Sequence, residues 1–437
     1  MKKIGLILIM VLSILIVTGC NNQKDDSVIS FSWWGTSDRS VSTYKAIELF
    51  EKKYPEYKVE GDFTVWSGYQ QSLSNKLSRG RESDVFQINY NWVYSMYGKD
   101  HFLDLNELNI DFSKYPVNEH KPLMIDNKIL GLSQSETGYI FYLNKSVYDQ
   151  AGASIPTTWQ ELIDAGNKIG ALNSEKYAIG RLDAQQVAML MFSYLSQITG
   201  KNVIEEDKLS FTQQELQQGF AFINVLRNNN VLIPSNATDT HNDGPSNPRW
   251  QQQENYGGVL TWNTAISEYE NTLPNASEKL VMAGMFQQEA NERLGMYKKV
   301  SMAYAVSKRV TQSETKQKAV EAFLEFMTTD PEAVKVLGVD RGVSNHTVTQ
   351  SILANDETNS FKNTLEWKGH DIVQAYYNAQ LEENIDLYIH PFYEHDTFRK
   401  IYESPIEKFL FGTVTAQQAA SEIISRFDTE LLKVING

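Results

Sequence analysis

Tryptophan, tyrosine and short polar side chains gather where runs of β-forming residues end in this sequence. The residues at these points are Trp34 with Thr36, Trp66, Asn89 with Tyr90, and Trp262. Flat aromatic rings stack on the apolar C–H faces of a pyranose, while nearby amides and hydroxyls satisfy the sugar hydroxyls. Each tryptophan alone is compatible with an ordinary core residue, but their repetition at successive strand ends favours a site. The set predicts recognition of a sugar without bond cleavage.

The first part of the chain supplies the elements that would position these side chains. Its patterns run in the order strand 28–34, helix 42–54, strand 57–63, helix 66–78 and strand 84–89. The first helix pattern has Tyr44, Ile47 and Phe50 on one stripe and stops at Pro55. This βαβαβ order predicts a parallel sheet flanked by helices, which binds ligands at the carboxyl ends of its strands.

The remainder of the chain predicts a second α/β region, from about 139 to 287, and further elements beyond it. Strand patterns lie at 140–143, 257–262 and 299–306, helix patterns at 158–170, 185–199, 317–327 and 416–435, and a polar loop at 235–248. There is no internal repeat and no linker rich in proline and glycine. We therefore expect lobes that are interwoven along the chain.

Composition limits the classes of function. The chain has 437 residues and a formal net charge of −14. An acidic surface argues against nucleic acid and against electrostatic adhesion to anionic lipid. At about 150 residues per domain, this length predicts two or three lobes.

The N-terminus has the pattern of an export signal. Lys2 and Lys3 precede an apolar run, 4–17, that is shorter than the roughly 20 residues that span a bilayer. The following Gly19-Cys20 resembles a bacterial lipobox, and Cys20 is the only cysteine, which excludes an internal disulfide. We expect a signal peptide at 1–19, a lipidated thiol at Cys20 and a flexible tether at 20–27. The alternative is an uncleaved membrane anchor; both place the globular part outside the cytoplasm.

Seven longer motifs carry a family resemblance in their order along the chain. They are SWWG at 32–35, AIELFEKKYP at 46–55, SDVF at 83–86, YLNK at 142–145, PTTWQEL at 156–162, AFLEFM at 322–327 and RGVS at 341–344. Together they resemble the extracellular solute-binding proteins of the maltose-binding type. The resemblance implies an α/β, two-lobed periplasmic-binding-protein-like fold of the class II type, with parallel-rich sheets, three hinge crossings and closure over a ligand.

The same resemblance implies a division of the chain. The lobes would be 28–137 with about 290–342, and about 138–289 with 343–437. The crossings would lie near 133–138, 286–299 and 341–345. The importer's membrane and ATPase subunits would be separate chains, and this one has no G-x-x-x-x-G-K-[ST] motif of its own.

The resemblance also suggests roles for individual residues. Trp34 and Trp262 are the expected stacking platforms from opposite lobes, with Trp66 and Tyr90 as secondary candidates. At the crossings, Glu136 would accept hydrogen bonds from sugar hydroxyls and Arg341 would donate a fork of them. Asn89 could do either. The alternative for Arg341 is a salt bridge to Asp340 or to a neighbouring lobe, whereas Asp84 is expected to be structural.

One departure from the family pattern concerns charge. Lys298 and Lys299 stand where many relatives have a pair of glycines. Two lysines near the cleft would favour an acidic sugar or another carboxylate. The favoured interpretation is that both are solvated surface residues.

Catalytic and metal-binding patterns are weak. A glycosidase needs two carboxylates about 5 to 9.5 Å apart, yet aromatic and amide side chains occupy the strand ends. S-x-x-K occurs at 42–45 and 313–316 without its companion motifs, and G-x-S-x-G and H-E-x-x-H are absent. His390 and His395 are five apart and do not share a helical face. We expect no catalysis, no cofactor and no metal.

The sequence therefore predicts a monomeric, lipid-anchored receptor that binds a carbohydrate and hands it to an ABC importer's permease. Three alternatives stay open. One is a receptor for another polar solute, such as a polyol, peptide or polyamine. The second is a surface glycosidase, and the third is an adhesin or sensor that presents a bound glycan to a partner.

Overall fold

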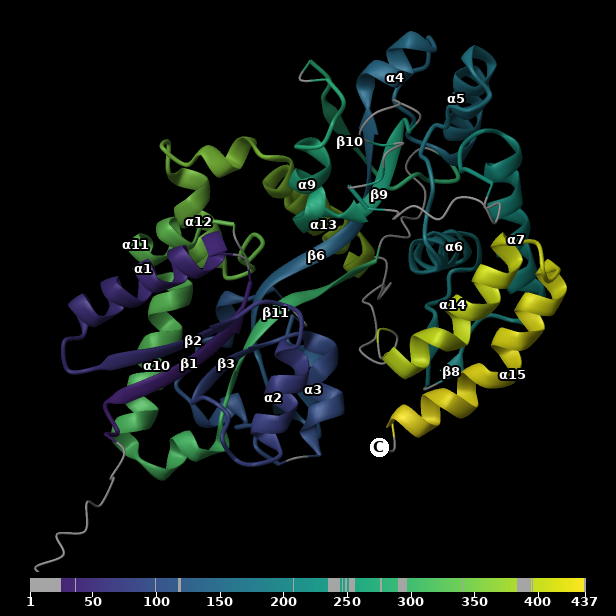
Figure 1. Cartoon of the computed structure of the whole chain (residues 1–437). Helices are drawn as coiled ribbons and strands as arrows, with labels where there is room; N and C mark the ends of the chain where they lie inside the picture. Colours follow the sequence, from purple (N-terminus) through teal and green to yellow (C-terminus); the bar gives the residue numbers. More distant parts are fainter. Residues whose placement is uncertain are drawn as a thin grey trace, which may run out of the picture.

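The computed structural model describes most of the chain. The described residues are 25–35, 37–98, 100–116, 119–206, 208–234, 244–245, 247, 250, 256–275, 277–289, 297–339, 341–382, 394 and 396–435. They form two α/β lobes, which lie side by side in Figure 1 and are joined by strands that run between them. The predicted signal peptide, Cys20 and the start of the tether fall outside the described residues.

The first lobe is built on the predicted βαβαβ unit. Its elements are β1 (Val28–Trp34), α1 (Ser37–Lys53), β2 (Lys58–Thr64), α2 (Tyr69–Leu77), β3 (Val85–Ile88) and α3 (Tyr90–Tyr97). β1 pairs in parallel with β2 on one side and with β3 on the other. The predicted parallel sheet is therefore confirmed, and β1 begins and ends at the predicted residues. Burial of Phe50 and its neighbours holds α1 against the sheet.

One long strand, β6 (Leu132–Asn144), belongs to the sheets of both lobes. It is buried along its whole length. Its first half pairs with β11 (Lys298–Val306), and its second half lies between β9 (Gly258–Trp262) and β10 (Leu280–Gly284), all antiparallel. The strands follow the order β10-β6-β11-β3-β1-β2, with β9 also on β6. The sequence pattern had indicated only 140–143 of this strand.

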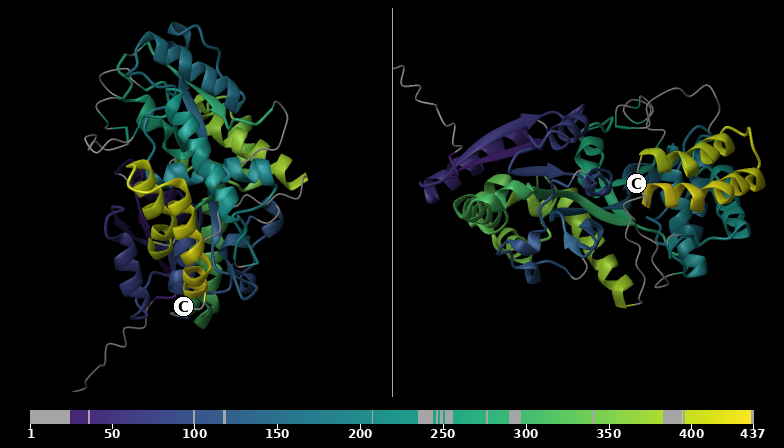
Figure 2. Two further views of the ribbon diagram at one scale, coloured as in Figure 1. Left: turned by 90° about the vertical axis from the view of Figure 1, so that its right-hand side faces the viewer. Right: turned by 90° about the horizontal axis from the view of Figure 1, so that it is seen from below.

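Helices cover both lobes, as Figure 2 shows. Beside the first sheet are α10 (Glu314–Thr329), α11 (Pro331–Leu337) and α12 (Thr347–Asn355), and α13 (Leu365–Glu382) packs on β6. The second lobe has α4 (Lys145–Gln150), α5 (Trp159–Leu172), α6 (Ala184–Thr199), α7 (Gln213–Asn228), α9 (Ile266–Glu270), α14 (Asp396–Leu410) and α15 (Ala416–Ile435). The short strands are β4 (Met124–Ile125), β5 (Lys128–Ile129), β7 (Ile204–Glu205) and β8 (Lys208–Leu209).

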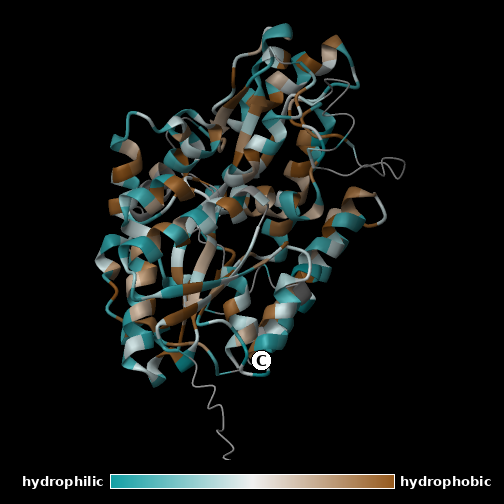
Figure 3. Ribbon diagram, turned by 60° about the vertical axis from the view of Figure 1, so that its left-hand side comes forward, coloured by the Kyte–Doolittle hydropathy of each residue, from teal (hydrophilic) through white to brown (hydrophobic). Residues whose placement is uncertain are grey.

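Local sequence fixes where several helices begin. Thr158 and Glu161 form a capping box at the start of α5, and Asp183 with Gln186 does the same for α6. α6 is buried on nearly all sides because α7 and α14 pack against it. Figure 3 shows apolar residues along the strands and polar residues on the outer helices. Within the described ranges, no helix combines the length and apolar character needed to cross a membrane.

The lobes meet at Gly138, where the pairing of β6 changes from β11 to β9. A Cβ atom at Gly138 would lie 2.7 Å from a methyl group of Val373 and 3.3 Å from the carbonyl oxygen of Tyr297. The close approach of α13 therefore requires glycine at this position.

We predict that Gly138→Ala lowers the free energy of unfolding by about 1–3 kcal/mol, because the added methyl overpacks the junction. Urea denaturation followed by circular dichroism measures the change. Gly98→Ala is the matched control, since nothing lies within 4 Å of a Cβ there. Equal stabilities for the two variants would contradict the assignment.

Candidate functional site

The predicted strand ends converge on one edge of the connected sheet. β1 and β3 are parallel, so Trp34 and Asn89 emerge at the same edge. β11 runs antiparallel to β3 with Ala303 opposite Ile88, so Lys299 lies beyond the carboxyl end of β3. Trp262 ends β9 opposite Tyr139, the residue after the junction glycine. This is the edge at which such folds bind ligands.

Four aromatic rings form a cluster at the end of β1, which we call the aromatic shelf: Trp34, Trp66, Tyr69 and Trp92. Trp66 stacks on Trp92 with ring centroids 5.2 Å apart, and Trp34 lies 5.3 Å from each of them. Tyr69 donates a hydrogen bond to the carbonyl oxygen of Gln87 over 2.9 Å, which fixes the base of the shelf. The rings support one another, so an exposed member of the shelf is held rigidly.

The accessibility of the shelf differs from the sequence expectation. Trp34, the expected platform, is only 5% exposed, whereas Trp66, the secondary candidate, is 53% exposed. The reason is topological, because β1 is an inner strand and Trp66 follows the edge strand β2. Trp66 thus offers the open ring and Trp34 supports it. The sequence places Trp92 at the same strand end as Tyr90, but Trp92 was not chosen there as a binding residue.

A buried ion pair lies beside the second predicted platform. The Nζ atom of Lys299 lies 2.6 and 2.7 Å from the two carboxylate oxygens of Glu394, and their side chains are 12% and 6% exposed. The same ammonium lies 4.3 Å from the ring centroid of Trp262 and 5.5 Å from that of Tyr90. We call Lys299 and Glu394 the charged pair. The expectation of a solvated surface lysine at 299 was wrong.

The first turn of α3 joins the shelf to the charged pair. Trp92 belongs to the shelf, Tyr90 faces Lys299, and the Asn91 side-chain amide donates to the Glu394 carbonyl oxygen over 3.2 Å. Burial raises the pKa of Tyr90, and the Glu394 carboxylate raises it further, so Tyr90 keeps its proton. The side-chain oxygens of Asn89 and Asn91 are buried and accept no hydrogen bond from any described residue.

Trp262 is less open than the sequence suggested. It is half-buried, and its ring centroid lies 3.8 Å from that of Tyr139, with 47° between the planes. Its neighbours are thus an aromatic ring and the Lys299 ammonium.

Glu136 has a different partner from the predicted one. It is fully buried, and Lys298, itself 1% exposed, donates to its carboxylate. Lys298 is therefore also not a surface residue. The Glu136 backbone N–H donates to Asn345 Oδ1 over 3.0 Å. The Asn345 side chain donates in turn to Glu119, which also accepts from Ser133 over 2.5 Å. These five residues, the hinge cluster, connect the three predicted crossings.

The hinge cluster holds two carboxyl groups and one ammonium. Glu119 and Lys298 are each 1% exposed and Glu136 is fully buried. Burial and the neighbouring Glu136 carboxylate raise the pKa of Glu119 well above its usual value. Burial alone would raise the pKa of Glu136 too, but the Lys298 ammonium and a hydrogen bond from Glu119 together outweigh it and lower that pKa. Glu119 therefore keeps its proton to a higher pH than an ordinary glutamate, while Glu136 is the charged partner of Lys298.

The Arg341 side chain donates hydrogen bonds to residues of the first lobe. Its Nε donates to Gln87 Oε1 over 3.1 Å, and its Nη2 donates to Thr43 Oγ1 over 2.6 Å. Its carbonyl oxygen accepts from Ser135 of β6. The predicted fork of donors is thus directed at protein groups. Its alternative partner Asp340, like the predicted Thr36 and the histidines at 390 and 395, lies outside the described residues.

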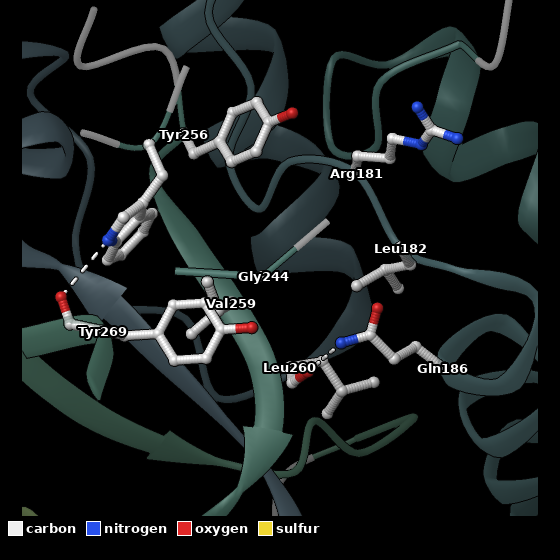
Figure 4. Close-up of a pocket in the computed structure, with 9 residues that line it drawn as sticks. Arg181, Leu182, Gln186, Gly244, Tyr256, Val259, Leu260 and Tyr269 are labelled. Carbon is white, nitrogen blue, oxygen red and sulfur yellow. Dashed lines mark hydrogen bonds between the residues drawn. The ribbon is translucent and has the colours of Figure 1, made fainter. Parts of the chain in front are cut away.

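A small pocket lies inside the second lobe, as Figure 4 shows. It has a volume of about 10 Å³ and is lined by Arg181, Tyr256, Tyr269 and others. Gln186 closes one side by donating to the Leu260 carbonyl oxygen over 2.8 Å. That volume holds about one water molecule and is too small for a sugar ring. Among the described residues, no group of three or more His, Cys, Asp or Glu side chains could hold a metal ion.

The family of the chain agrees with the two-lobed fold and with a binding site at the sheet edge. The family model described as bacterial extracellular solute-binding protein matches residues 34–334. The chain belongs to this family. The match includes the aromatic shelf, Trp262 and Lys299, but it ends before Glu394.

The similar proteins include sugar-binding proteins and a designed enzyme with the same fold. A multiple sugar-binding protein of Streptococcus mutans is 22% identical over 368 residues, covering 78% of this chain and 81% of the relative. A periplasmic oligogalacturonide-binding protein of Yersinia enterocolitica, solved with saturated digalacturonic acid, is 24% identical with a TM-score of 0.76, covering 93% of this chain and 99% of that one. A designed cysteine esterase shares the fold, with a TM-score of 0.80, 24% identity, and coverage of 93% and 98%.

The esterase likeness concerns the fold alone. A cysteine esterase needs a thiol nucleophile, and the single cysteine of this solute-binding protein is Cys20, before the folded lobes. The family and the curated relative are binding proteins.

We predict that the hinge cluster makes stability depend on pH. The folded protein keeps the Glu119 proton above pH 4.5, the ordinary pKa of the side chain, whereas the unfolded chain releases it. The stabilising contribution is therefore complete below pH 4.5 and is lost as the pH rises toward the folded-state pKa. Glu119→Gln cannot titrate, so its free energy of unfolding should fall less steeply, by up to about 1.4 kcal/mol per pH unit.

Urea denaturation at a series of pH values from weakly acidic to weakly alkaline measures this slope. Glu56→Gln, at an exposed carboxyl group, is the control and should follow the wild type. Parallel curves for wild type and Glu119→Gln would mean that Glu119 carries no extra proton.

Proposed function

We propose that this chain is the lipid-anchored, extracytoplasmic binding protein of an ABC importer, which captures a sugar or oligosaccharide by hinge closure and delivers it to the permease. The aromatic shelf carries the proposal. Trp66 exposes 53% of its surface while its ring is held by Trp92 and Trp34. A rigid, open ring at the ligand-binding edge of an α/β sheet suits the flat apolar face of a pyranose.

Polar groups around the shelf complete the case for a carbohydrate. The side-chain oxygens of Asn89 and Asn91 can accept from hydroxyl groups, and the charged pair offers a donor and an acceptor side by side. The sugar-binding names of the Streptococcus mutans and Yersinia enterocolitica proteins support the same class of ligand. A polyamine receptor would need an excess of carboxylates, and Glu394 is already neutralised by Lys299.

Closure would occur about the hinge cluster. We assign 28–137 with about 290–342 to the first lobe, and about 138–289 with 343–437 to the second, except that α12 packs on α10 and α11 of the first lobe. The three crossings lie together because Lys298 pairs with Gly138 and Ser135 forms a bridge with Ser344. A monomer that closes on its ligand would dock on the transmembrane permease subunits, which are separate chains, as is the ATPase.

We predict that Trp66→Ala weakens sugar binding by about 1–3 kcal/mol and leaves the fold intact, because it removes the exposed stacking ring. A thermal-shift screen of oligosaccharides identifies a ligand, and calorimetry then gives the affinities. Phe411→Ala is the matched control, since Phe411 is 46% exposed and lies beyond the end of α14, away from the shelf.

Two results would oppose the sugar assignment. One is an unchanged affinity in Trp66→Ala. The other is a screen in which amines or peptides, but no saccharide, stabilise the protein. Incubation with the best ligand should yield no cleavage product; a product would favour the glycosidase alternative.

We predict that Cys20→Ala releases the protein from the membrane, because it removes the thiol that would carry the lipid. Expression in a bacterial host, metabolic labelling with palmitate and fractionation measure the change. Wild type should carry label and sediment with membranes, while the variant should be unlabelled. Identical labelling of both proteins would rule out this anchor.

A further inference from the structure

The charged pair lies beside Trp262, at the edge of the sheet where the strand ends converge. The Lys299 ammonium lies over Trp262, at 4.3 Å, and beside Tyr90. Glu394 reaches it from the residues just before α14, and the Asn91 amide binds the Glu394 backbone. Two aromatic rings, from the end of β9 and from the first turn of α3, thus lie against one ion pair. A sugar placed against Trp262 would contact that pair.

Three cations on β11 and α14 already have carboxylate partners. Lys299 pairs with Glu394, and Lys298 pairs with Glu136 on the neighbouring residue of β11. Arg399 of α14, whose charge acts on Tyr139 next to Trp262, pairs with Glu403 over 2.7 Å. Together with the Asp183 carboxylate, which also acts on Tyr139, these described residues therefore carry no excess positive charge.

We propose that Glu394 sets the charge class of the ligand: by neutralising Lys299 beside Trp262, it makes the cleft accept uncharged glycans and reject those that carry a carboxylate. The inference rests on the proposed function. It replaces both interpretations of the lysines, since neither lysine is solvated and neither offers an unmatched positive charge.

Burial of the charged pair strengthens its electrostatic effect on a ligand. The side chains of the pair are 12% and 6% exposed, so water screens their charges weakly. A uronate carboxylate that approached Lys299 would meet the Glu394 carboxylate in the same weakly screened space, and like charges repel there. A neutral hydroxyl group meets no such barrier, because it can accept from the ammonium and donate to the carboxylate.

The experiment compares wild type, Glu394→Gln and Lys299→Met in the full chain. The probes are saccharides matched except for charge, such as galactobiose with digalacturonic acid and cellobiose with cellobiouronic acid. Calorimetry gives the ratio of neutral to acidic affinity for each protein. Glu422→Gln in α15, which removes a carboxylate paired with Lys408, is the matched control.

We expect wild type and Glu422→Gln to bind the neutral member at least tenfold more tightly. Glu394→Gln keeps the shape of the side chain but leaves the Lys299 charge unmatched, so the ratio should fall at least tenfold through gain of the acidic ligand. That gain should weaken with added salt and should be absent in Lys299→Met. Melting curves show whether each variant is folded.

The outcomes separate this inference from the proposed function. Wild type that prefers the acidic member, or a ratio unchanged in folded Glu394→Gln, overturns the inference while the sugar assignment stands. If no saccharide binds to wild type across the whole screen, both fall together.

Discussion

The lobes depend on the burial of charge inside a strand that both of them share. β6 is covered along its full length, and Glu136 lies near its middle with no access to water. An unpaired carboxylate there would cost far more than a domain of this size can tolerate. Lys298 meets that charge, and Asn345 and Glu119 complete the hydrogen bonding. Because these residues come from distant parts of the chain, the strand is stable only when all of them have assembled.

Two consecutive residues of β11, Lys298 and Lys299, belong to two different clusters. Successive side chains of a strand point to opposite faces, so Lys298 is directed to the hinge cluster and Lys299 to the charged pair. The hinge cluster and the charged pair are therefore adjacent along the backbone of β11. A change in the local geometry of β11 would reach both.

Local patterns predicted the elements of the first lobe but not the contacts that give them a role. Alternation and helical stripes were sufficient to place β1, α15 and the strand ends, since burial of one face repeats along each of them. Residues 133–137 of β6 are polar, so no hydrophobic pattern marks them as a strand. Their burial depends on partners up to 212 positions away, such as Asn345 for Ser133. The pairing of Lys299 with Glu394, 95 residues apart, was equally invisible to spacing.

The position of β11 also governs the order in which the chain can fold. It lies between β3 and β6, yet it comes about 150 residues after β6 in the sequence. Until residues 298–306 emerge, β3 and β6 each have an unpaired edge, and the closure of so long a loop slows folding. A chain synthesised from its N-terminus therefore cannot complete the first sheet early. The sheet of the first lobe is thus completed only after residue 306 has been synthesised.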